Sequence, residues 1–263
     1  MEVVNFIKKK LYPPLKSYEL EGLKAYKSGT DEIIRLFDSK INKEINPQNF
    51  YLEPNIIYWM KTLNQKSETI LKRIGIPNIG LEIKYDEPFS VAGEFRKTAT
   101  PVFDLKMDEI EWKMDNPVLT INIHERFRKN FKITSAVLAH EIVHFYIWYN
   151  FIKKGLIKSF SVKERNIILE NDEVICEITT FLLGLGKIYL NGIFEKEVKE
   201  SFLREIIETT SMRTYLPWYF LLYIYERINF IKGIPKRISR KNLSYLVKKS
   251  LLRMSNHQDL IES

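Results

Sequence analysis

The stretch 140–144, His-Glu-Ile-Val-His, holds residues whose types and spacing suit metal chemistry. Two histidines four residues apart lie on one face of an α-helix, so the ring nitrogens of His140 and His144 can reach one metal ion. Tetrahedral zinc suits such imidazole ligands. Glu141 follows the first histidine, and from beside the metal its carboxylate can move a proton from metal-bound water to a leaving amine. The spacing therefore predicts a hydrolytic zinc centre.

The residues around this stretch favour a buried helix. Apolar residues surround almost its whole circumference, and no helix breaker interrupts 136–148. Thr134 or Ser135 is expected to cap its start, and the sequence Lys-Lys-Gly at 153–155 is expected to end it. The competing interpretation is two core histidines bonded to backbone carbonyls. A chance match to the five-residue pattern has odds under roughly one in a hundred, which favours the metal.

A catalytic zinc needs a third protein ligand and keeps a fourth position for water. The acidic stretch 170–177 supplies candidates at the start of a second helical run. Glu173 and Glu177 are four residues apart and share a helix face. The competing interpretation is a solvated acidic helix start, which the helix dipole stabilises.

The sequence Asp-Glu-x-x-x-Glu at 172–177, following the histidine helix, resembles the glutamate helix of the gluzincin (thermolysin-like) metallopeptidases. The resemblance implies that Glu173 binds zinc and that Glu177 hydrogen-bonds a ligand histidine and orients it. The family has Asp where this chain has Glu177, and 28 residues separate His144 from Glu173, more than in short-spaced members. Glu170 and Glu177 therefore stay open as alternative ligands.

The resemblance covers about residues 115–225 and extends to small uncharacterised bacterial proteins of the same class, through the stretches 181–186 and 215–217. It also implies a downstream donor for the tetrahedral oxyanion. Tyr215 is the first candidate, because it precedes a helix-starting proline, and Arg213 and Tyr219 are the others. His124, at the end of a predicted strand, is an alternative donor or ligand, or a surface residue.

The fold is expected to be α+β and mostly helical, in three parts. Residues 1–50 form an N-terminal helical extension that covers the cleft or meets a partner. Residues 51–190 form a zincin-like core with a backing helix, a small mixed sheet, the histidine helix and the glutamate helix. Residues 191–263 form a C-terminal helical region that closes the cleft.

The hydrophobic pattern predicts the individual elements. A strand is expected over 118–123. The zincin resemblance implies that it lies at the edge of the sheet and pairs with an extended substrate, and the alternative is an ordinary sheet strand. Asp31 and Glu32 are expected to cap a helix. The predicted helices are 17–27, 31–42, 54–74 (ended by Gly75-Ile76-Pro77), 195–209, 217–230 and 240–253, and the predicted strands are 81–85, 91–100, 102–105, 111–114 and 118–123.

The composition, 45% apolar and 28% charged, is that of a soluble globular protein. Net charge is +8, so the basic region 232–253 is a candidate for weak nucleic-acid binding, against the interpretation of a solvated helix face. Cys176, the single cysteine, excludes an internal disulfide and is expected to be a small buried residue, with a metal or redox role as the alternative. No run reaches the length of a membrane span, and a cytoplasmic protein is expected.

Together these features predict a zinc-dependent metallopeptidase acting on a peptide or protein. Two alternatives remain. One is a catalytically silent or latent zinc-binding regulatory protein, with residues 1–50 plugging the cleft. The other is a nucleic-acid-associated protease, or a non-enzymatic binder that uses the basic C-terminal region.

Overall fold

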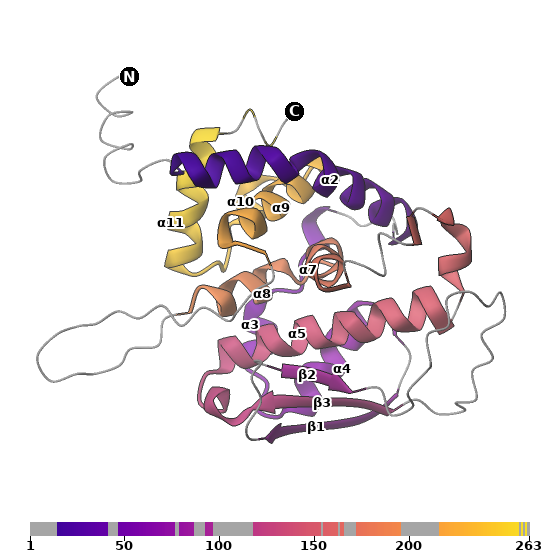
Figure 1. The fold of residues 1–263 in the computed structure, drawn as a ribbon. Helices are drawn as coiled ribbons and strands as arrows, with labels where there is room; N and C mark the ends of the chain where they lie inside the picture. The colour runs from indigo at the N-terminus through magenta and orange to yellow at the C-terminus, as the bar shows by residue number, and fades with distance from the viewer. Residues whose placement is uncertain are drawn as a thin grey trace, which may run out of the picture.

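A computed structural model describes most of the chain, and the statements below concern that part. Within it the protein is mostly helical with one small sheet, as expected for the α+β class. Helix α5 (Phe131–Ile147) has the strands on one side and the main group of helices on the other (Figure 1). The described residues are 15–41, 47–76, 79–86, 93–96, 118–153, 155–162, 164–165, 172–195, 216–257, 259 and 261.

The sheet has three described strands in the order β1-β3-β2. Strand β3 (Val118–His124) runs parallel to β1 (Gly80–Asp86) and antiparallel to β2 (Gly93–Arg96). The prediction that β3 is an edge strand is therefore wrong. Its side chains are buried on both faces, as in a central strand, because β1 and β2 pair with it on either side and α5 packs against the sheet.

The strand predictions over 81–85 and 118–123 are confirmed by β1 and β3. Of the strand predicted over 91–100, the described part is β2. The strands predicted over 102–105 and 111–114 lie outside the described residues.

Helix α5 begins earlier than the sequence suggested. The side-chain oxygen of Asn130 accepts a hydrogen bond from the backbone N–H of Ile133 and caps the helix, so neither Thr134 nor Ser135 is the cap. The hydroxyls of these two residues instead donate to backbone carbonyls of preceding residues. The helix continues as a π-helical turn over Trp148–Lys153 and has stopped by Gly155, whose φ of 70° suits glycine.

Helix α2 (Ser17–Ile41) is one continuous helix, whereas the sequence suggested two with Asp31 as a cap. The Asp31 carboxylate faces α9 (Trp218–Ile231), where it accepts hydrogen bonds from the Tyr223 hydroxyl at 2.7 Å and from the Arg227 guanidinium at 3.1 Å. Because the Asp31 carboxylate bonds residues of α9, it does not act as a helix cap. Helix α2 packs on α9 and α7 (Asp172–Leu182), so it belongs to the core.

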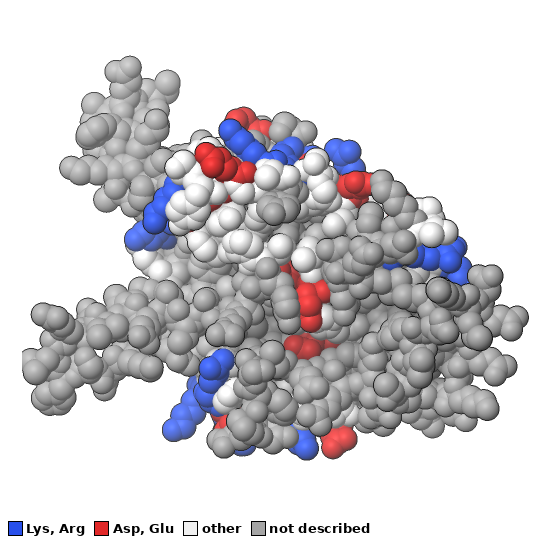
Figure 2. All heavy atoms as spheres, in the orientation of Figure 1, with Lys and Arg blue, Asp and Glu red and all other residues white. Residues whose placement is uncertain are grey.

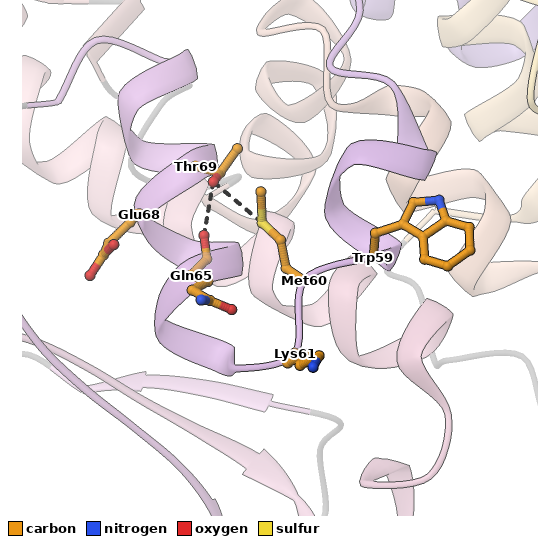
Figure 3. A pocket seen from close by; sticks show the side chains of 6 residues that line it. All are labelled: Trp59, Met60, Lys61, Gln65, Glu68 and Thr69. Carbon is orange, nitrogen blue, oxygen red and sulfur yellow. Dashed lines mark hydrogen bonds between the residues drawn. The ribbon is translucent and has the colours of Figure 1, made fainter.

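The helix predicted over 54–74 is divided into α3 (Pro54–Tyr58) and α4 (Leu63–Arg73). Thr62 starts α4 afresh, because its side chain and that of Gln65 form a reciprocal capping box. The predicted stop at Gly75 is confirmed by its φ of 76°. A shallow hollow of about 440 Å³ lies beside this turn, and the Trp59 side chain is directed away from Met60 and Thr69 (Figure 3).

The C-terminal region contains α8 (Gly186–Ile193), α9, α10 (Lys236–Ser239) and α11 (Tyr245–Met254). The helix predicted over 217–230 is confirmed, and that over 195–209 lies almost wholly outside the described residues. The helix predicted over 240–253 begins only at Tyr245, because Asn242 has a φ of 60° and Ser244 caps α11. Among the described helices, none combines the length and apolar character that a membrane crossing requires.

Helices α5 and α8 approach closely because Gly192 has no side chain. A Cβ atom on Gly192 would lie 2.3 Å from the Ala136 Cβ and 2.7 Å from the Lys132 carbonyl oxygen. These contacts are far inside van der Waals distance, so a side chain would push α8 away from the helix that carries the histidines.

We expect Gly192→Ala to lower the free energy of unfolding by about 1–3 kcal/mol, because the added methyl overpacks the α5–α8 contact. Gly29→Ala is the matched control, since Gly29 lies inside α2 with no atom within 4 Å of an added Cβ. It should stabilise the protein by about 0.5–1 kcal/mol. Urea unfolding of both variants tests this, and equal midpoints would contradict the close α5–α8 contact.

Candidate metal centre

Helices α5 and α7 bring three ligand-type atoms together. The Nε2 atoms of His140 and His144 lie 3.2 Å apart, and the Oε2 atom of Glu173 lies 3.2 Å from the first and 3.1 Å from the second. Ligand atoms about 2.0–2.1 Å from one tetrahedral ion lie roughly 3.3 Å from each other. The two-nitrogen, one-carboxylate set therefore fits zinc in both chemistry and spacing.

The centre is enclosed on its α5 side and open on its α7 side. His140 and Glu141 are each 7% exposed, whereas the Glu173 side chain is 34% exposed. Helix α5 is buried almost all round, as its sequence predicted, and α7 packs on it (Figure 1). A substrate or solvent molecule would approach from the side of the Glu173 carboxylate.

Cys176, one helical turn after Glu173 on α7, also reaches the histidines. It is fully buried, as expected, and its Sγ atom lies 3.6 Å from Nδ1 of His140. Sγ also lies within 4.8 Å of a ring nitrogen of His144, so the two histidines and the thiol are a second set of metal-binding groups. Sγ faces Nδ1 of His140 and Glu173 faces Nε2, and the tighter spacing favours Glu173 as the third ligand.

Glu177, predicted to orient a ligand histidine, is fully buried and holds two other groups. It accepts a hydrogen bond from the Tyr189 hydroxyl at 3.0 Å and from the backbone N–H of Leu216 at 3.1 Å. The Tyr189 ring is stacked on His140, with centroids 5.6 Å apart and planes 8° apart. Glu177 is thus linked to the ligand histidine through Tyr189, which sequence reasoning missed because nothing in its local pattern separates it from a core aromatic.

The charges of the centre are strongly coupled in the metal-free protein. Burial alone would lower the pKa of His140, but the Cys176 sulfur and the Glu173 carboxylate raise it to about 10. The pKa of His144 is also raised by these neighbours against the effect of burial. Burial raises the pKa of Glu173, yet hydrogen bonds from the two imidazoles hold it well below its usual range. Each of the three groups is therefore favoured in its charged form by its neighbours.

The remaining candidates are placed as follows. His124 uses Nδ1 to accept a hydrogen bond from the Arg126 N–H, so its ring caps the short turn after β3. Tyr219 lies against α2, with its hydroxyl 3.0 Å from the position of a Cβ on Gly22. Glu170, Arg213 and Tyr215 lie outside the described residues.

No protein-family model, curated protein or solved structure matches this chain. The gluzincin resemblance therefore stays a prediction that rests on the two motifs and on the geometry described above.

Metal binding should release protons, because zinc needs neutral imidazoles and displaces the protons they hold. The pKa of His140 is about 10 when folded and about 6.5 when unfolded. Its protonation therefore stabilises the metal-free fold fully below about pH 6.5, and this contribution is lost as pH rises toward 10. Zinc affinity should rise over the same window, about tenfold per pH unit for each proton displaced. Calorimetry in buffers of different ionisation enthalpy measures the protons, and an affinity constant between pH 7 and 9 would contradict the coupling.

Removing Glu173 should distinguish it from the other acidic candidates. We expect Glu173→Gln to weaken zinc binding more than about 100-fold. Loss of a residue that only hydrogen-bonds a metal ligand costs roughly 10–100-fold in affinity, and loss of the ligand itself should cost more. Glu170→Gln is the matched control and should bind one zinc per chain with unchanged affinity. Chelator competition and elemental analysis measure both. A larger loss in Glu170→Gln than in Glu173→Gln would reassign the ligand.

Proposed function

We propose that this protein is a zinc-dependent metallopeptidase of gluzincin type that hydrolyses peptide bonds in a peptide or protein substrate. The observation that carries the proposal is the cluster of His140, His144 and Glu173, whose ligand atoms lie 3.1–3.2 Å apart. Glu141 is next to His140 in the sequence and is buried with it. The order of elements also supports it, since a helix and a small mixed sheet precede the histidine helix and the glutamate helix, as in a zincin-like core.

Each residue of the centre has one task in this proposal. His140, His144 and Glu173 would hold the ion. A bound zinc ion polarises the scissile carbonyl and lowers the pKa of its water toward about 7. Glu141 accepts the proton of the attacking water and then passes it to the leaving amine. Its burial strengthens this role, because a carboxylate shielded from bulk solvent interacts strongly with nearby charge.

The substrate is proposed to lie along the sheet. Strand β3 has partners on both sides, so it has no free edge for an extended peptide. Among the described strands the outer edges belong to β1 and β2, and β2 packs against α5. Pairing with β2 would bring a peptide backbone near the histidine helix with little dependence on side chains. Tyr215 stays the proposed donor to the oxyanion.

A catalytically silent or latent zinc-binding protein is the second candidate. The enclosure of His140 and Glu141 favours it, because a peptide needs an open cleft. Two hollows lie elsewhere in the described structure, one beside the α3–α4 turn and one of about 100 Å³ along α9. Neither is lined by residues of the centre.

Nucleic-acid association finds less support in the C-terminal region. Lys232 pairs with Asp38, Arg240 with Glu226 at 3.6 Å, and Arg253 with Glu19 at 3.5 Å. The described residues on the face in view include both basic and acidic side chains (Figure 2). These three cations are engaged with carboxylates of their own fold, so they are poorly placed to neutralise phosphates.

The variant Glu141→Gln should lose peptide cleavage by a factor of about 10²–10⁴, because the amide cannot accept the proton of the attacking water. Zinc content should stay near one ion per chain, because the ligands are intact. The measurement is the release of fragments from a mixture of denatured proteins by the zinc-loaded full chain.

Glu125→Gln is the matched control, since Glu125 pairs with Arg128 on the surface and should leave cleavage unchanged. Cleavage by Glu141→Gln at the parental rate would remove Glu141 as the base. A parent chain that binds one zinc but releases no fragments would favour the silent protein.

A further inference from the structure

The thiol of Cys176 lies next to the Nδ1 atom of His140, a proposed metal ligand. The Sγ atom of Cys176 lies 3.3 Å from the backbone carbonyl oxygen of His140 and 3.6 Å from Nδ1 of its ring. A neutral thiol has one weak donor and weak acceptor capacity. Its S–H can donate to the carbonyl oxygen while its sulfur accepts from an Nδ1–H group. In the thiol form, donor and acceptor are therefore matched to the two groups of His140.

This arrangement defines which ring nitrogen can bind a metal. An Nδ1–H directed at sulfur selects the tautomer whose lone pair lies on Nε2. Nε2 is the atom that faces Glu173 and His144 at 3.2 Å. Tyr189, stacked on the ring, restricts rotation out of the plane. Cys176 thus contacts the Nδ1 edge of the His140 ring, and Tyr189 contacts its face.

We propose that Cys176 is the positioning residue for His140, a task that the gluzincin resemblance assigns to an acidic side chain. The inference rests on the proposed metal centre and adds a residue that orients one of its ligands. The acidic residue of the motif, Glu177, instead holds Tyr189 and the backbone before α9. On α7, Cys176 contacts His140 directly, and its neighbour Glu177 contacts the Tyr189 that stacks on His140.

The replacement has a chemical consequence. A carboxylate behind a ligand histidine raises the basicity of the ring and its donation to the metal. Sulfur is a weaker hydrogen-bond acceptor than a carboxylate oxygen, so it would fix the orientation of His140 with less donation to the metal. A cation held by these residues would therefore keep more of its positive charge, which would favour polarisation of a carbonyl.

Removal of the sulfur should weaken metal binding without unfolding the protein. Cys176→Ala deletes both contacts, Cys176→Val deletes them while filling the space, and Cys176→Ser restores them through a hydroxyl. Thr179→Val is the matched control, since Thr179 is fully buried on the same helix and its hydroxyl has no hydrogen-bond partner among the described residues. Circular dichroism of each variant reports whether the fold is retained.

The expected result is a loss of zinc affinity of about 10-fold or more in Cys176→Ala and Cys176→Val, by chelator competition. Cys176→Ser and Thr179→Val should stay near the parent. Cobalt(II) in the parent should lack the intense near-ultraviolet charge-transfer band of a thiolate ligand, and its visible spectrum should change in the Ala and Val variants.

Three outcomes separate the possibilities. Parental zinc affinity and an unchanged cobalt spectrum in Cys176→Ala would overturn the positioning role while the metal centre stands. A thiolate charge-transfer band in the parent would also overturn it, because Cys176 would then be a ligand. This spectrum is measured on the parent protein, so it does not depend on whether a variant folds. A parent chain that binds neither zinc nor cobalt would refute the proposed function itself.

Discussion

The crossing of α5 and α7 is the constraint on which the rest of the structure depends. Two imidazoles from one helix and one carboxylate from another meet with ligand atoms 3.1–3.2 Å apart. The pKa of His140 is raised there, because the Cys176 sulfur and the Glu173 carboxylate outweigh the effect of burial. The helices cannot be held together by these groups alone, so the apolar packing around them must impose the crossing.

That packing is visible in the partners of α5. Helix α8 approaches it through Gly192, the sheet packs on its other side, and α7 carries Glu173, Cys176 and Glu177 in little more than one turn. Each of these three side chains acts on a different part of the centre: the proposed ion, the Nδ1 edge of His140, and the tyrosine on its face. Helix α7 thus carries the proposed ligand Glu173 together with two side chains that contact His140 of α5, Cys176 directly and Glu177 through Tyr189.

Much of this could be predicted from the sequence, and the reasons for the failures are physical. The spacing of His140 and His144 needs only helical geometry. The choice of Glu173 came from the gluzincin resemblance, because spacing alone left Glu170 and Glu177 open as ligands. Strand positions 81–85 and 118–123 followed from alternation, but strand order did not, because it depends on pairing across distant segments. Cys176 was expected to be buried, whereas its contact with Nδ1 of His140 arises from tertiary packing that spacing cannot reveal.

Helix α2 also has a consequence for how the protein could be controlled. Its Asp31 is bonded to Tyr223 and Arg227, and its Phe37 ring stacks on Phe151 with centroids 5.2 Å apart. Helix α2 is therefore packed against both α9 and the π-helical turn after α5. Unlike a removable pro-segment, it cannot move away from the core without breaking these contacts. Proteolytic excision of residues 15–41 would expose the core side chains that these residues cover and would lower the stability of the fold.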